Sequence, residues 1–214
     1  RPAALVHAAQ DYVSFIVLLG GLFVISGGIL LEGDLEATPR TNAAFLGLGA
    51  VLASFVGTTG ASMLLIRPLL QTNRERKHVV HTVVFFIFLV SNIGGCLTPL
   101  GDPPLFLGYL LGVPFTWTFR LFVPWLFTTA LLLAVYVLWD RRAHAREAKP
   151  DIKRDFYEVR PLRLAGKESL ALLGGVLAAV AFLGAPWREV VIVLLSVASY
   201  ARTDPGLRKA NRFS

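Results

Sequence analysis

Long blocks of apolar residues, separated by short polar stretches, dominate the pattern of this chain. Residues 12–31 are nearly uncharged over a length that suffices for a helix to cross the hydrocarbon core of a bilayer. Residues 120–139 form a second such block, which has no charge in its interior and is therefore expected to be scaffold. Two shorter apolar helices are expected at 169–183 and 189–200. The pattern predicts an all-α, polytopic membrane protein.

An interrupted apolar block covers residues 42–70, with Gly-Thr-Thr-Gly near its middle. One possible shape is a single span with a break, and the other is a re-entrant hairpin. The two arms hold about fourteen and eight to ten residues, which at roughly 1.5 Å per residue is too short to cross a bilayer. This favours the hairpin, with its tip at 57–62 at membrane depth. The hairpin requires loop 32–41 to be cytoplasmic, although its three acidic residues suggest the outside.

A third unusual block covers residues 82–111, and its centre at 91–104 cannot be a regular helix. Three prolines there remove backbone donors, and three glycines loosen the chain. In hydrocarbon, unpaired backbone groups and a carboxylate are costly, so irregular backbone persists only where it lines a cavity walled by protein. The sequence therefore predicts a transmembrane helix that is broken beside Asp102, as in the ion sites of transporters.

Composition and charge agree with a membrane protein. Of the 214 residues, 55% are hydrophobic and only 16% are charged, whereas soluble domains have nearer a quarter charged. The net charge of +7 could indicate a nucleic-acid partner, but the basic residues lie between the apolar blocks. This is the positive-inside pattern of a protein whose partner is the lipid bilayer, and it requires no nucleic acid. It places 67–81, 140–168 and 202–212 in the cytoplasm, with 140–168 as an exposed, partly helical linker.

Asp102 is the leading candidate for a functional side chain. A carboxylate at membrane depth can bind a cation when ionised and a proton when neutral, and competition between the two is the simplest basis for exchange. Oxygens from Ser91, Asn92 and Thr98, together with unwound carbonyls, suit a hard cation such as sodium. Alternatively, Asp102 only caps a second half-helix that begins at Pro103, or the helix N-termini hold an anion.

Thr58 and Thr59, at the hairpin tip, are the remaining candidate ligands. Two broken segments in one half-molecule are a sequence sign of a transport site, although the two hydroxyls could instead bond back to the preceding helical turn. The predicted sodium ligands are Asp102, Asn92 and Thr98. The residues expected to shape the two breaks are Gly57, Gly60, Gly94, Gly95, Pro99 and Gly101.

Several aromatic and histidine side chains lie near predicted helix ends. Trp125 near one end of a block, and Tyr136 and Trp139 near the other, are expected at the membrane interfaces. His78 and His81 flank a basic loop and are expected there too, rather than as metal ligands. The four scattered histidines form no metal motif, and no catalytic triad, phosphate loop or dinucleotide motif is present in the sequence. We expect a protein that is not an enzyme and has no cofactor, with sodium as substrate.

Two segments carry a resemblance to a known family: GTTGASMLLIRPLL at 57–70 and SNIGGCLTPLGDPPLFLG at 91–108. They resemble the first repeat of bacterial sodium/proton antiporters of the NhaD type, in the ion transporter superfamily with citrate, dicarboxylate and arsenite carriers. Each inverted repeat of that family holds a re-entrant hairpin and a helix broken at an Asn-x-Gly-Gly…Thr-Pro-x-Gly-Asp-like motif. The matching residues here are Asn92, Gly94, Gly95, Thr98, Pro99, Gly101 and Asp102.

The resemblance implies sodium/proton antiport across the bacterial cytoplasmic membrane by a full-length homodimer. It implies a first repeat at 1–139, a linker at 140–168 and the start of a second, truncated repeat at 169–214, so the chain resembles an N-terminal half. The alternative is a citrate, dicarboxylate or arsenite carrier, in which helix N-termini face the anion and Asp102 is structural. Gly-Thr-Thr-Gly differs from the Ser-Asn-Thr-like tip of dicarboxylate carriers, which favours antiport. A membrane scaffold without transport activity would leave both costly breaks unexplained.

Overall fold

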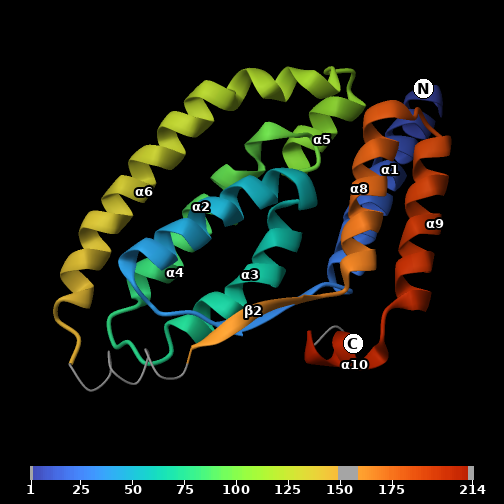
Figure 1. Cartoon of the computed structure of the whole chain (residues 1–214). Coiled ribbons are helices and arrows are strands. Elements are labelled where there is room, and N and C mark those ends of the chain that lie inside the picture. The colour runs from blue at the N-terminus through green and yellow to red at the C-terminus, as the bar shows by residue number, and fades with distance from the viewer. Residues whose placement is uncertain (1, 149–158, 212–214) are drawn as a thin grey trace.

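Helices make up nearly all of the regular structure in the computed structural model, which describes residues 2–148 and 159–211 (Figure 1). The α-helices are α1 (Pro2–Ser26), α2 (Pro39–Val56), α3 (Thr58–Thr72), α4 (Val80–Leu89), α5 (Pro103–Leu110), α6 (Phe122–His144), α8 (Lys167–Phe182), α9 (Trp187–Arg202) and α10 (Pro205–Ala210). Two 3₁₀ segments are η1 (Ile93–Leu97) and η2 (Phe115–Leu121). Three helical segments are long and apolar enough to cross a membrane: Leu5–Ser26, Val80–Leu97 and Phe115–His144. The predicted all-α membrane class is confirmed.

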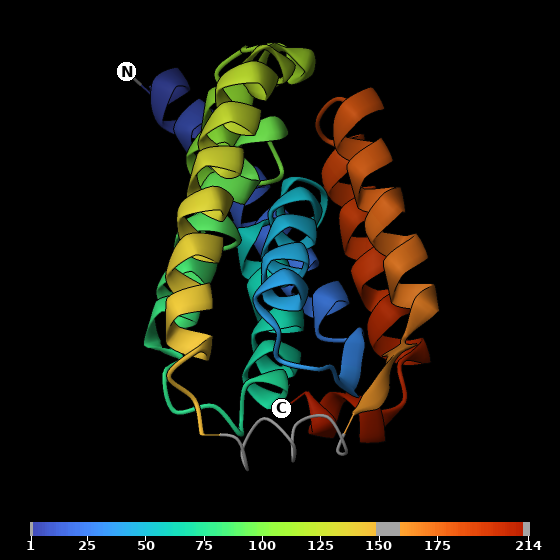
Figure 2. The same cartoon turned by 60° about the vertical axis from the view of Figure 1, so that its left-hand side comes forward.

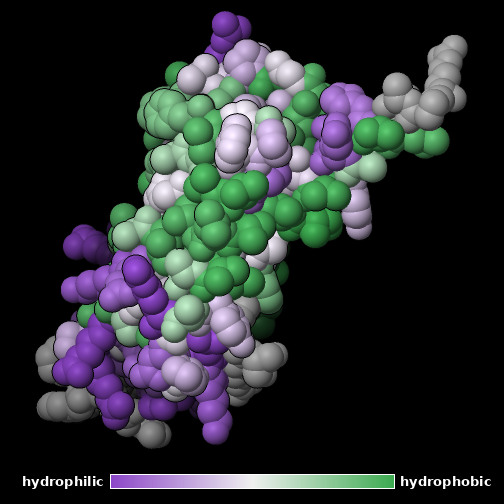
Figure 3. All heavy atoms as spheres, turned by 90° about the vertical axis from the view of Figure 1, so that its right-hand side faces the viewer, coloured by the Kyte–Doolittle hydropathy of each residue, from purple (hydrophilic) through white to green (hydrophobic). Residues whose placement is uncertain are grey.

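The helices form two groups that meet along α1. In one group α1 packs against α8 and α9, and in the other α2 packs against α3, α4 and α6 (Figure 1). Buried side chains such as Leu18, Ile25, Leu46 and Leu89 join the two groups in one core. Many large apolar side chains remain exposed on the outer faces of the helices. Figure 3 shows apolar residues across the middle of one face and hydrophilic residues concentrated at its lower end, as expected for a surface in contact with lipid.

Two short strands were missed by the sequence analysis. β1 (Leu30–Asp34) pairs with β2 (Arg160–Ala165) in an antiparallel sheet, with Glu32 opposite Arg163 and Asp34 opposite Arg160. Opposite charges at facing positions stabilise such a pair. The centre of the linker predicted at 140–168 lies outside the described residues. Within them, α6 continues to His144, and Arg160–Ala165 form an exposed strand, which the prediction did not include.

The first predicted helix, at 12–31, also differs from the structure. α1 starts at Pro2 and ends at Ser26, and Leu30 is already in β1. The chain can change direction here because Gly28 lies directly against Gly166, where a β-carbon on Gly166 would be 1.9 Å from the Gly28 carbonyl oxygen. The glycine pair at 27–28 directly follows the end of the helix.

One end of the molecule gathers the polar connections. β1, β2, α10 and the start of α4 lie together at the lower end of the molecule (Figures 1 and 2). Arg67 of α3 donates hydrogen bonds to the carbonyls of Ala210 (2.7 Å) and Asn211 (2.6 Å), which fixes α10 at this end. Loop 32–41 lies at the same end as the basic segments on either side of α10 and α4. By the positive-inside pattern we expect this end, which we call the basic end, to face the cytoplasm.

Candidate transport site

The helical hairpin α2–α3 turns at a single residue. Gly57 has φ +80°, a conformation that L-residues with a side chain rarely adopt, and α3 starts at the next residue. The tip is therefore tighter than the predicted 57–62. With 18 and 15 residues, α2 and α3 are about 27 and 22 Å long, which is less than the roughly 30 Å of a hydrocarbon core. Both arms are longer than the sequence analysis suggested.

The second break lies where the prolines and glycines predicted it. α4 ends at Leu89, the short η1 follows, and α5 does not begin until Pro103. Between them the backbone is irregular, with Thr98 and Asp102 both in extended conformations. Pro103 occupies the first position of α5, where a missing N–H costs nothing.

The two breaks meet in one place, which we call the junction: Gly57 and Thr58 of the hairpin, and residues 94–102 of the broken helix. The Thr58 N–H donates a 2.9 Å hydrogen bond to the Gly101 carbonyl. Gly95 and Gly101 touch so closely that a β-carbon on Gly101 would be 2.0 Å from the Gly95 carbonyl oxygen. Glycine is required at both positions because each would otherwise collide with backbone that has no room to move.

Ser54 and Thr98 hold the junction to α2. Ser54 Oγ donates to the Gly94 carbonyl, and Thr98 Oγ1 donates to the Ser54 carbonyl while accepting from Leu100 N–H at 3.2 Å. Thr98 is 1% exposed. These two bonds leave one lone pair of the Thr98 hydroxyl for an ion. Ser54 was not among the predicted residues, and the only sequence sign for it was a hydroxyl three residues before the Gly57 turn.

Asp102 lies at the N-cap of α5 and is half-buried. Its backbone carbonyl accepts from Leu105 N–H at 3.0 Å and Phe106 N–H at 3.2 Å, but its carboxylate makes no capping hydrogen bond. The side-chain cap that was the alternative role for Asp102 is therefore not formed in the structure. Among residues 2–148 and 159–211, no group of three His, Cys, Asp or Glu could hold a metal ion, so sodium would rely on hydroxyl and carbonyl oxygens.

The other predicted ligands are spread around the junction. Thr58 is buried within it, whereas Thr59 and Asn92 are exposed. Ser91 is half-buried and shares a 2.8 Å hydrogen bond with Ser62 of α3. The structure thus brings Thr58 and Asp102 to the junction through the Gly101 contact, and it places the other three nearer the surface of the described chain.

A second polar cluster, which we call the basal network, lies at the basic end and was missed. Asp140 is 0% exposed and accepts two hydrogen bonds from Arg76, at 3.1 and 2.5 Å. His81 Nε2 lies 2.8 Å from the same carboxylate, and the Tyr136 hydroxyl donates to it at 3.2 Å. His81 is 8% exposed because its ring nitrogen lies against Asp140, which directly follows the apolar block at 120–139.

The predicted aromatic positions need a correction. Tyr136 is 0% exposed and Trp125 is also buried, so neither lies in a membrane-interface belt. Trp139 is 56% exposed, as expected for an interfacial residue. Tyr136 faces inward because its hydroxyl finds Asp140 and also shares a 3.1 Å hydrogen bond with Thr82.

Glu147 and an asparagine pair extend the network to neighbouring elements. The Glu147 carboxylate accepts from the N–H groups of Lys77, at 3.1 Å, and His78, at 2.9 Å. Burial by itself would raise the pKa of Glu147, but the N–H groups of His78 and Lys77, with the nearby charges, hold its pKa below the ordinary value. Asn42 and Asn73 exchange hydrogen bonds of 2.8 and 2.9 Å. The base of the hairpin, α4 and α6 are thereby held together.

Comparison with known proteins indicates a membrane transport family. The model of a family described as "Putative citrate transport" matches residues 2–214. The inner membrane protein YbiR of Escherichia coli (strain K12) is 31% identical over 107 residues, which cover 45% of this chain and 28% of that protein. No solved structure matches the chain.

Proposed function

The chain belongs to this citrate transport family, and we propose that it forms half of a secondary carrier for a small organic anion of the citrate type in the bacterial inner membrane. One observation supports the junction as its site: α3 and α5 both begin there, and neither N-terminus has a side-chain cap. Both N-termini carry partial positive charge, and that of α3 also presents N–H groups that have no carbonyl acceptor within their own helix. A carboxylate suits both properties, because it is negatively charged and its oxygens accept hydrogen bonds.

Of the two N-termini, only that of α3 offers N–H groups, because α5 begins with Pro103 and Pro104, which have none. Its Thr58 N–H is bonded to Gly101 and its Ala61 N–H to the Gly57 carbonyl. The N–H groups between them, of Thr59 and Gly60, lie in the first turn, where an α-helix supplies no carbonyl partner. Thr59 is also exposed. We propose that these two N–H groups and the Thr59 hydroxyl receive one carboxylate of the substrate.

In this proposal Asp102 holds the coupling cation or proton. Its carboxylate makes no capping hydrogen bond, and it lies in the segment that contacts the start of α3 through Gly101. Neutralising Asp102 with a cation or a proton lowers its repulsion of a nearby anion, which couples the two species electrostatically. The other half of the site would come from a second hairpin and a second broken helix, as in inverted-repeat carriers.

Sodium/proton antiport is the second candidate, and the state of Asp102 favours it. A half-buried carboxylate without a capping bond could alternate between sodium and a proton with no anion involved. The sequence resemblance ranks antiport first, whereas the family match favours the organic anion.

Reconstitution separates the two candidates. The full-length protein in proteoliposomes would be given a sodium or proton gradient, and citrate uptake and internal pH would be followed together. We expect saturable citrate uptake that needs the gradient and falls at least about tenfold in Asp102→Asn. Glu36→Gln, which changes an exposed acid outside the junction, should behave as wild type. Sodium-driven pH change without citrate uptake would favour antiport, and the absence of both would refute transport at this site.

A further inference from the structure

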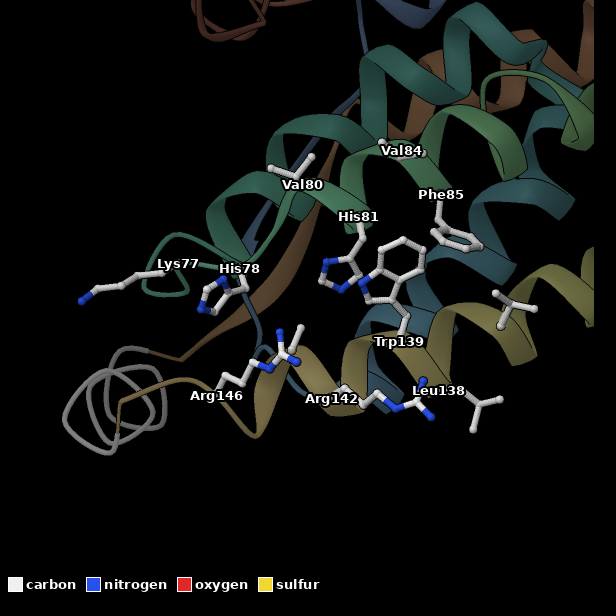
Figure 4. Close-up of a pocket in the computed structure, with 12 residues that line it drawn as sticks. Lys77, His78, Val80, His81, Val84, Phe85, Leu138, Trp139, Arg142 and Arg146 are labelled. Carbon is white, nitrogen blue, oxygen red and sulfur yellow. The ribbon is translucent and has the colours of Figure 1, made fainter.

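A groove between α4 and α6 opens at the basic end (Figure 4). Its volume is about 590 Å³. The basic residues that line it are Lys77, His78, His81, Arg142 and Arg146. The apolar and aromatic residues that line it include Val80, Val84, Phe85, Val135, Leu138 and Trp139. The groove therefore has a cationic mouth and an apolar track.

The order of these residues along the helices sets the direction of the groove. Lys77 precedes α4 and Arg146 follows α6, so the cationic mouth lies at the ends of both helices. Val84 and Leu138 lie one to two turns further into segments that are long and apolar enough to cross a membrane. Trp139 forms one wall, with its ring parallel to that of His81 at 6.0 Å between centroids. The track consequently runs from the basic end towards the interior of the bilayer.

The charge at the mouth is strongly positive. No acidic side chain is among the lining residues of the described chain. The three acids nearest in sequence are engaged elsewhere: Asp140 is fully buried against Arg76, Glu147 accepts backbone N–H groups, and Glu75 pairs with Arg74. Arg142, in the last turn of α6, and Arg146, just beyond its end, are both exposed and both line the groove.

We propose that this groove is a binding site for an anionic phospholipid. The headgroup phosphate lies beside Arg142 and Arg146, and one acyl chain follows the track beside Val84 and Leu138. Basic pockets between membrane helices on the cytoplasmic side recognise anionic headgroups. Free phosphate shares the headgroup chemistry, but it has no acyl chain to occupy an apolar track that continues into the membrane segment. The site is independent of the junction and of its substrate.

The test compares lipids on the full-length protein purified in detergent. Unfolding temperatures would be measured with added phosphatidylglycerol, phosphatidylcholine or inorganic phosphate, and bound lipid would be counted by native mass spectrometry. We expect stabilisation by phosphatidylglycerol only, and a weaker effect when its acyl chains are shortened to six carbons. Equal stabilisation by inorganic phosphate, or by phosphatidylcholine, would overturn the proposal.

Variants locate the site. Arg142→Gln with Arg146→Gln should weaken phosphatidylglycerol binding about twentyfold, because each basic side chain near a membrane surface adds attraction for anionic lipid. Arg141→Gln is the matched control, since Arg141 is the exposed neighbour on the same helix and does not line the groove. Leu138→Gln changes an exposed track residue and should also weaken binding while the protein stays folded. Wild-type affinity in both the double variant and Leu138→Gln would overturn the proposal.

Discussion

Removing the Asp140 carboxylate should destabilise the protein more than any other single change in the basal network. Asp140→Ala would leave the Arg76 guanidinium buried without its bidentate partner and would also remove the acceptor of Tyr136 and of His81. Breaking a buried ion pair by removing one partner costs about 3–5 kcal/mol. Because Arg76 keeps the carbonyl of Ala37 at 3.3 Å and the more distant Glu147 carboxylate at 3.9 Å, we expect a cost near the lower end of this range, about 3 kcal/mol.

A double variant tests whether the stranded charge is the cause. Replacing both partners, with Arg76→Met and Asp140→Leu, removes the buried charge along with the pair. Such replacements are often close to neutral, so the double variant should be more stable than Asp140→Ala alone. The coupling between the two sites should then exceed about 1 kcal/mol, since they are in direct contact.

Unfolding in mixed detergent micelles, followed by far-ultraviolet circular dichroism, measures these differences in free energy. Arg141→Ala is the control, because it changes an exposed charge on the same helix and should stay within about 0.5 kcal/mol of wild type. A cost below about 1 kcal/mol for Asp140→Ala would refute the buried network. So would a double variant less stable than Asp140→Ala.

Three further outcomes are expected. Gly101→Ala should abolish the junction and cost more than about 3 kcal/mol in the same assay, because its β-carbon would meet the Gly95 carbonyl, whereas Gly174→Ala has open space and should be tolerated. Ser54→Ala should cost about 1–2 kcal/mol by leaving the Gly94 carbonyl without its donor, and a loss below about 0.3 kcal/mol would contradict that bond. Glu147 should make stability depend on pH: its pKa is lowered on folding, so its contribution is complete above the ordinary glutamate pKa and lost as pH falls through the lowered value. The rise in the free energy of unfolding between pH 3 and 7 should therefore be smaller in Glu147→Gln than in wild type. An unchanged slope would argue against the N–H contacts.

The breaks could be predicted from sequence because their signal is local. Prolines and glycines at 91–104 prevent a regular helix whatever the rest of the chain does. Because unpaired backbone is costly in hydrocarbon, a break there indicates a site that is lined by protein. Arm length was also a local clue to the hairpin at 42–70. The sequence did not show that Gly57 alone makes the turn, because only the structure gives its φ of +80°.

The pairings that were missed depend on residues far apart in the chain. β2 pairs with β1 across about 130 residues, and neither strand is apolar enough to stand out from a polar linker. Asp140 directly follows the apolar block that was expected to be scaffold without charges. From the sequence it therefore looked like the first residue of a solvent-exposed polar segment. Its role depends on Arg76, 64 residues earlier, which looked like one basic residue among several in a loop.

The basal network and the junction differ in how completely their polar groups are paired. In the basal network the carboxylate of Asp140 has three protein partners, which is how a protein keeps a buried charge at modest cost. At the junction the Asp102 carboxylate makes no capping bond, and the N-terminus of α3 lacks a side-chain cap. Unpaired polar groups at membrane depth are tolerated only where another group supplies the missing hydrogen-bond or charge partner. A substrate, a coupling ion and the opposing repeat of a carrier are the partners that would do so, and α4 links the fixed cluster to the open one.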